Sequence, residues 1–133
     1  MTKTVHAIAC VVINKKGKIL LLKRSPDKKL SPGKWFVVGA YPLDENADFE
    51  KKVHMELLEE TGMDGKITKT GEVLKMETDG TLIDVHIFLA ERNSGMVKIN
   101  NEHTEFKWVD LQEIKNYDLV PGTYEMVDNL FKK

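Results

Sequence analysis

The chain has 133 residues, of which 41% are hydrophobic, and its 20 Lys and Arg residues nearly balance its 21 Asp and Glu residues. The formal net charge is -1. This length and composition predict one domain, spanning residues 1–133, with one ordinary hydrophobic core. The balanced charge excludes the basic footprint of a nucleic-acid-binding protein and the polybasic patch of a membrane-surface protein, so neither partner is expected.

The cysteine content and the lengths of the apolar runs indicate in which cellular compartment the protein is expected. Cys10 is the single cysteine and lies in an apolar run. Within one chain it forms no disulfide, and we interpret it as a small buried hydrophobe rather than a nucleophile. No apolar stretch reaches the roughly 18 residues of a transmembrane helix, and the first residues lack the pattern of a cleavable signal peptide. A reduced, cytoplasmic protein is therefore expected.

The first third of the chain predicts strands. Residues 5–14 are rich in Val and Ile and predict a buried strand, and residues 18–24 predict a second strand after a turn. A polar loop at residues 25–34 precedes a short apolar strand at residues 35–38. We expect Gly39 to end that strand.

An amphipathic helix is predicted over residues 48–61, with Asp48 as its N-cap and Gly62 as its C-terminal stop. Its apolar stripe recurs every four residues, at Phe49, Val53 and Leu57, with Leu58 beside it.

The second half of the chain predicts three more strands, at residues 66–77, 81–91 and 105–109. Residues 111–116 and 123–131 predict two short amphipathic helices. Strands, one central helix, more strands and a terminal helix together predict an α/β or α+β domain.

The central helix ends in a cluster of glutamates, Glu56, Glu59 and Glu60. Positions i, i+3 and i+4 share a helix face, so the three carboxylates are expected to point the same way. Like charges at this spacing repel, and Mg2+, a hard cation that takes oxygen ligands, removes the repulsion. The spacing alone fits a magnesium site or the more common solvated acidic face.

Several segments of the chain resemble the Nudix hydrolases, a family that includes the MutT-like enzymes. The family's box reads G-x5-E-x7-R-E-U-x-E-E-x-G-U, with U aliphatic, and its second half matches Glu56, Leu57, Glu59, Glu60, Gly62 and Met63. The G-K-W that often precedes the box matches residues 33–35, a strand ending in arginine matches residues 19–24, and an acid-then-tryptophan stretch matches residues 102–109. The resemblance covers most of the chain and implies an α/β/α sandwich around a mixed β-sheet.

The first half of the box departs from the family pattern. Counted back from the glutamates, the box arginine falls on Met55, the first box glutamate on Ala47 and the box glycine on Tyr41. Counted forward, Gly39 and Glu45 have the spacing of the box glycine and first glutamate, with two extra residues before the helix. An insertion in the loop between residues 41 and 46 accounts for the difference, because loops absorb insertions at low cost.

The two missing box residues form a salt bridge in the family. Because both are absent here, no charge is left without its partner. We interpret the change as a structural brace replaced by packing of Met55, and Lys52, one turn before Glu56, as an alternative charge partner.

The resemblance implies a set of site residues. The catalytic and metal-binding set comprises Glu56, Glu59, Glu60, Glu102 and the backbone carbonyl of Gly39, and Arg24 is a candidate ligand for substrate phosphate. Alternatives stay open for three of them: a turn glycine, a surface-loop glutamate and an exposed strand-end cation. The histidines show no metal-ligand spacing and are interpreted as structural or surface residues: His6, His54, His86 and His103.

The implied reaction is Mg2+-dependent hydrolysis, with Mn2+ as an alternative ion, of a nucleoside diphosphate linked to another moiety. Two or more ions between the glutamates and the diphosphate would neutralise charge and activate water, with Glu56 or Glu102 as the base. A nucleoside triphosphate, ADP-ribose and a dinucleotide polyphosphate all remain open as substrates, and the protein is expected to be a monomer or a homodimer.

Two other functions fit the sequence. A catalytically silent Nudix-fold module would bind a nucleotide without turnover. A structural or interaction domain would carry its acidic helix only as surface, and its stability would not depend on metal.

Overall fold

The structure is a computed structural model that describes residues 4–78, 80–92 and 96–131. Its strands form one mixed sheet, and they are β1 (Thr4–Ile13), β2 (Ile19–Arg24), β3 (Trp35–Phe36), β4 (Val38–Leu43), β5 (Lys66–Thr70), β6 (Leu74–Thr78), β7 (Thr81–Glu91) and β8 (His103–Val109). The helical elements are α1 (Phe49–Thr61), the 3-10 helix η1 (Leu111–Asn116) and α2 (Thr123–Phe131).

The centre of the sheet is the pair of long strands β1 and β7. They run parallel over ten residue pairs, from Thr4↔Leu82 to Ile13↔Glu91. The other pairings are antiparallel, and the strand order is β3-β2-β1-β7-β5, with β4 beside β1, β6 beside β7 and β8 beside β2. The expectation of a mixed sheet is therefore confirmed.

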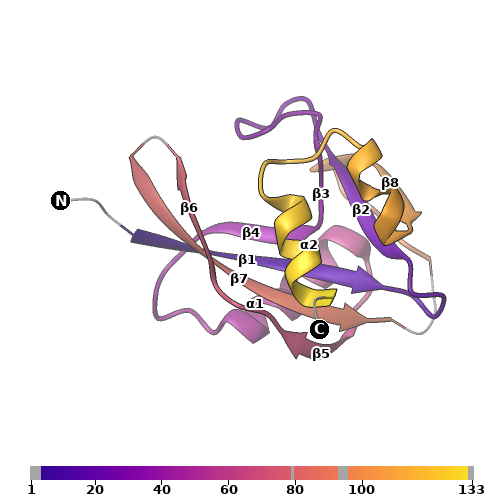
Figure 1. Cartoon of the computed structure of the whole chain (residues 1–133), viewed down its shortest axis with the longest axis horizontal. Helices are drawn as coiled ribbons and strands as arrows, with labels where there is room; N and C mark the ends of the chain where they lie inside the picture. The colour runs from indigo at the N-terminus through magenta and orange to yellow at the C-terminus, as the bar shows by residue number, and fades with distance from the viewer. Residues whose placement is uncertain (1–3, 79, 93–95, 132–133) are drawn as a thin grey trace.

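The two α-helices cover opposite faces of this sheet (Figure 1). On the α2 face, Met126, Val127 and Leu130 pack on alternate β1 and β7 residues. On the α1 face, Val53 and Leu57 pack on the intervening residues of the same strands. The buried strands thus supply two cores at once, which is why residues 8–12 are apolar without alternation. This three-layer arrangement is the predicted α/β/α sandwich.

Helix α1 begins and ends where its capping residues predict. The Asp48 side chain accepts a hydrogen bond from the Lys51 backbone N–H at 3.1 Å, and Gly62 closes the helix with a φ of 75°. A cap of this kind stabilises a helix by about 1 kcal/mol. The apolar stripe is confirmed, whereas Leu58, expected beside it, is 54% exposed.

Several predicted elements differ in extent. Gly39 does not end a strand: it lies inside β4 and pairs with Ala9, and a Cβ at that position would lie 2.8 Å from the carbonyl oxygen of Ile8. Close backbone approach, rather than a turn, requires this glycine. The strand predicted at residues 66–77 is broken into β5 and β6, and residues 111–116 form a 3-10 helix.

Cys10 is fully buried in β1, as the sequence predicts. Burial raises the pKa of its thiol to about 12, so the thiolate needed for nucleophilic chemistry does not form. Among the helices in the described ranges, none has the length and apolar character needed to cross a membrane.

Candidate active site

The acidic end of α1 divides into a buried and an exposed part. Glu56 and Glu60 are 8% and 3% exposed, whereas Glu59 is exposed. Residues four apart lie nearly above one another on a helix, so Glu56 and Glu60 share the face that turns toward the sheet. The predicted set of three carboxylates is therefore a buried pair with Glu59 at its outer edge.

The loop before β8 brings Glu102 to the same region. Asn100 connects this loop to the helix: its Nδ2 donates to the Glu59 carbonyl at 3.0 Å, and its Oδ1 accepts from the Glu102 backbone N–H at 3.0 Å. Lys28 donates from Nζ to Glu102 Oε1 at 3.0 Å. The Asn100 side chain thus holds the Glu102 backbone beside the end of the helix, and the Glu102 carboxylate is paired with Lys28.

Glu60 and His103 meet in the buried part of the site, with 3.6 Å between His103 Nε2 and Glu60 Oε1. Burial, together with the nearby Glu56 carboxyl, raises the pKa of Glu60 to about 9, and the Gly39 backbone opposes this shift. Burial lowers the pKa of His103 to about 4. In the metal-free protein at neutral pH both groups are therefore mainly uncharged, and their contact is not an ion pair.

Glu56 has the charge partner that the sequence suggested as an alternative. Lys52 Nζ lies 3.7 Å from Glu56 Oε2, one helix turn away. Burial raises the pKa of Glu56, and the Lys52 charge opposes the shift. The interpretation that packing of Met55 replaces the missing brace is wrong, because Met55 is 50% exposed. Lys52, not Met55, interacts with the site.

A cavity of about 390 Å³ connects these groups. Its charged and polar lining comprises Arg24, Lys28, Ser31, Tyr41, Lys52, Glu56, Glu60, Glu102 and His103. Its apolar lining comes from β1, β3, β4, β6, β7, α2 and loop residues, and includes Ile8, Leu43, Met76, Val85, Pro121 and Met126. A ligand that fills this cavity must carry both a strongly charged part and an apolar part.

Two further predicted site residues line the cavity. Gly39 lies on β4 at the wall next to Glu60. Arg24 donates from Nε to the Leu30 carbonyl at 3.0 Å, which fixes the guanidinium in the cavity wall. Burial lowers the pKa of Arg24, and the charges of Glu60 and Glu102 oppose the shift. Among the predicted site residues, Glu59 alone does not line the cavity.

The donor set suits a hard cation, although it is not fully assembled. Glu60 Oε2 is buried and has no hydrogen-bond partner within the described residues. When Glu60 is ionised, such a buried oxygen requires a hydrogen bond or a cation. Over the same residues, no three His, Cys, Asp or Glu side chains form a ready metal-binding group. The exposed Glu59 and the Lys28-bound Glu102 explain why the group is incomplete.

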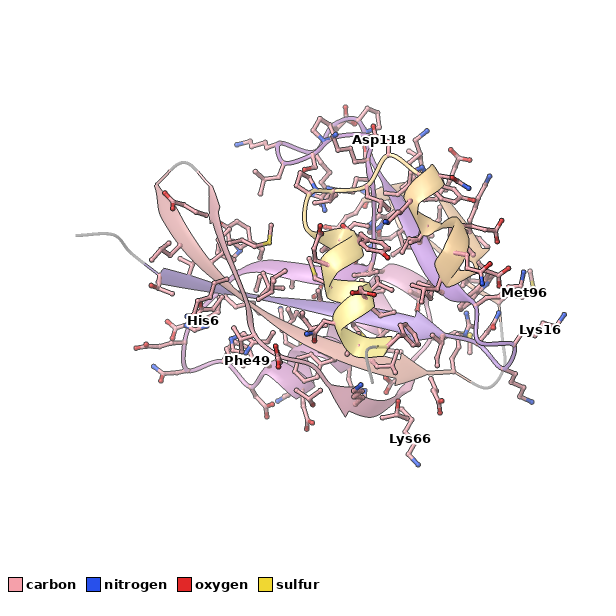
Figure 2. The ribbon with its side chains drawn as sticks, in the orientation of Figure 1. His6, Lys16, Phe49, Lys66, Met96 and Asp118 are labelled. Carbon is pink, nitrogen blue, oxygen red and sulfur yellow. The ribbon has the colours of Figure 1, made fainter. Side chains whose placement is uncertain are left out.

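The histidines fall into three environments. His6 and His86 lie on adjacent strands, 3.0 Å apart between ring nitrogens, and Phe49 stacks on His86 with 4.0 Å between centroids; Figure 2 shows His6 and Phe49 close together at one end of the molecule. His54 contacts Asp64 at 2.6 Å on the surface. These three fit the structural or surface interpretation, whereas His103 lines the cavity.

Sequence reasoning missed three residues of the site: Lys28, Asn100 and His103. Lys28 lies in the polar loop at residues 25–34, where one lysine among several carried no signal. His103 follows Glu102 directly, and that adjacency was the available signal. Asn100 acts through contacts with Glu59 and Glu102 that no local pattern reveals.

The sequence matches the NUDIX domain family over residues 3–130, and the chain therefore belongs to that family of hydrolases. The predicted recognition and the predicted Nudix-type enzyme are confirmed at this level. Among curated relatives, the nucleoside triphosphatase NudI of Klebsiella pneumoniae is 30% identical over 129 residues, covering 89% of this chain and 91% of that protein.

Solved structures agree with this assignment. The MutT protein from Methanosarcina mazei superposes with a TM-score of 0.82 and 25% identity, covering 99% of this chain and 98% of that one. An Ap4A hydrolase from C. elegans superposes with a TM-score of 0.74 at 22% identity, covering 94% and 93% of the two chains, which shows a shared fold.

Proposed function

We propose that this protein hydrolyses a nucleoside diphosphate linked to another moiety, with a nucleoside triphosphate as the first substrate to test. The observation that carries the proposal is the cavity, whose lining combines carboxylates and cations with apolar side chains. A nucleotide has the matching division into a polyphosphate and a base. The similarity to the nucleoside triphosphatase NudI supports the choice of substrate.

Glu56, Glu60, Glu102 and the Gly39 carbonyl are the groups we propose to hold Mg2+ or Mn2+, with Glu59 joining from the helix edge. Such ions would supply Lewis acidity, neutralising phosphate charge and activating water for attack at phosphorus. The guanidinium of Arg24 would bind phosphate oxygens. Glu56 or Glu102 would accept the proton of the attacking water, because both carboxylates line the cavity.

The experiment is a panel of nucleotides assayed with Mg2+ and with EDTA, with the products resolved. The panel holds nucleoside triphosphates, ADP-ribose and dinucleotide polyphosphates. We expect Mg2+-dependent release of a nucleoside monophosphate or diphosphate from at least one class. No turnover of any member would reject the proposed activity.

A catalytically silent nucleotide-binding module is a second candidate. The incomplete metal-binding group and the missing box residues at Met55 and Ala47 favour it. The melting temperature measured with nucleotide distinguishes both candidates from an interaction domain that binds no nucleotide. A nucleotide that binds the folded state stabilises it by about 2.7 kcal/mol when its free concentration is 100 times its Kd. Stabilisation without turnover would identify the silent module.

A further inference from the structure

The contact between Lys28 and Glu102 joins two segments that are 74 residues apart in the sequence. The Lys28 and Glu102 side chains are 30% and 41% exposed, so solvent and ligands reach the pair. Both residues line the cavity. The ammonium of Lys28 also holds the pKa of Glu102 below its usual value, so the carboxylate is ionised.

The backbones that carry the pair are fixed to each other. Ser25 donates from its backbone N–H to the Glu102 carbonyl at 2.9 Å, and the Lys28 N–H donates to the Ser25 carbonyl at 3.1 Å. The Asn100 side chain holds the Glu102 backbone from the other side. The two chain segments therefore stay together, while the long Lys28 side chain is free to turn about its four-carbon stem.

Lys28 competes with a divalent cation for the Glu102 carboxylate. An ammonium 3.0 Å from a carboxylate oxygen occupies the space that a divalent cation would need on that oxygen, and the two positive charges repel. A polyphosphate in the cavity carries oxygens of higher charge density, to which the Lys28 ammonium can bind instead. Lys28 can reach such a ligand by side-chain rotation alone, because it already lines the cavity.

We propose that Lys28 is an exchangeable counter-ion, bound to Glu102 in the nucleotide-free protein and to a phosphate oxygen when a nucleotide polyphosphate enters the cavity. The exchange frees the Glu102 carboxylate for a metal ion or for the reacting water. This inference rests on the proposed function, since it needs a polyphosphate ligand and a role for Glu102. It makes Lys28 a substrate-binding residue and links substrate binding to completion of the metal site.

The test compares Lys28→Met with Lys28→Arg, with Lys29→Met as the matched control. Lys29 is the next residue of the same loop, is exposed and does not line the cavity. Two quantities are measured: the Kd of Mn2+ for the nucleotide-free protein, by electron paramagnetic resonance, and kcat and KM on the substrate that the panel identifies. Melting temperatures establish that each variant is folded.

Lys28→Met is expected to move the two quantities in opposite senses. Mn2+ binding to the nucleotide-free protein tightens about threefold, because a competing ion pair is removed. KM rises about tenfold, because a charge-assisted hydrogen bond to phosphate is lost. Lys28→Arg keeps the wild-type Mn2+ affinity and recovers most of the KM, and Lys29→Met changes neither. In a Glu102→Gln background, Lys28→Met no longer affects Mn2+ binding.

Any other result contradicts the proposed exchange of Lys28 between Glu102 and a phosphate oxygen. A raised KM with unchanged Mn2+ affinity would make Lys28 a phosphate ligand only, and the reverse would make it a fixed counter-ion. No change in either would remove Lys28 from the site while leaving the proposed function intact. If the wild-type protein binds no Mn2+ and turns over no nucleotide, the proposed function fails and this inference fails with it.

Discussion

The two sides of the last turns of α1 present the same residue type in opposite environments. Glu56 and Glu60 face the cavity and are nearly inaccessible, whereas Glu59 is exposed beside the exposed Met55 and Leu58. Helix geometry explains the separation: relative to Glu56, Glu60 is rotated by about 40° in one direction and Glu59 by about 60° in the other. Glu59 and Glu60 are therefore about 100° apart around the helix, which is enough to place one carboxylate in solvent and the other in the interior.

The difference shows that burial, rather than charge spacing, gives these carboxylates their distinct properties. Glu60 has a pKa raised to about 9 and a buried oxygen without a partner in the described part of the chain. A group of this kind destabilises the metal-free protein unless it is protonated, and it gains most from a cation. Glu59 is exposed, so its carboxylate stays hydrated.

The largest effect is expected for Glu60→Gln, which keeps the shape of the side chain and removes its negative charge. We expect kcat to fall about a hundredfold or more with little change in KM, because the loss is mainly in stabilisation of transition-state charge. Steady-state kinetics on the substrate from the panel measure it. Glu50→Gln, an exposed position in the first turn of α1, is the control; equal rates in the two variants would contradict a catalytic role for the buried carboxylate.

The pH dependence of stability tests the same buried group without metal. The pKa of Glu60 rises from its ordinary 4.5 in the unfolded chain to about 9 in the folded protein, so the folded state binds more protons between these values. Its contribution to stability is fully present below pH 4.5 and is lost as the pH rises toward 9. Urea unfolding in EDTA should show this decline in the wild type and a weaker one in Glu60→Gln. Parallel curves for the two proteins would mean that Glu60 titrates normally.

Glu59→Gln is expected to have a smaller effect than Glu60→Gln, a loss in kcat of about tenfold, because solvent screens an exposed carboxylate. The Mg2+ concentration needed for half-maximal activity should rise in the same variant. If Glu59→Gln loses as much activity as Glu60→Gln, then Glu59 turns inward when metal and substrate bind, and the division of the cluster holds only for the metal-free protein.

The smallest effect is expected for Met55→Arg, which restores the family's box arginine on the exposed side. Because Met55 is half-exposed, the free energy of unfolding should change by less than about 0.5 kcal/mol. The doubly substituted Met55→Arg, Ala47→Glu protein should show little coupling energy in a double-mutant cycle measured by urea unfolding. A coupling of about 1 kcal/mol or more would show that the two positions are still neighbours.

Local features of the sequence were sufficient to predict α1. The apolar period, the Asp48 cap and the Gly62 stop all act within a few residues, and the structure confirms each of them. The expectation that Gly39 ends a strand was wrong because its surroundings are not local: the atoms that exclude a Cβ there belong to Ile8 and Phe36. A glycine in an apolar run does not tell a turn from a close approach unless its neighbours in space are known.

The residues of the site could likewise be predicted only where their contacts are local in the sequence. Glu56 and Glu60 were predicted from one helix, and Glu102 was placed with them by family resemblance rather than by any local pattern. The partner of Glu102 was missed because the hydrogen bond from Lys28 spans 74 residues. Met55 was given a packing role that its exposure excludes, since a hydrophobic side chain at a helix position does not by itself reveal which side faces the core.

The cavity draws its apolar lining from both cores of the sheet. Val85 and Met126 belong to the α2 core and Ile8 to the α1 core, and Glu56 and Glu60 stand on the helix that packs into the α1 core. The lining residues of the α2 core therefore belong to other elements than the helix that carries the carboxylates. A fold built this way allows ligand preference to diverge, in evolution or in the laboratory, through substitutions that leave that helix unchanged.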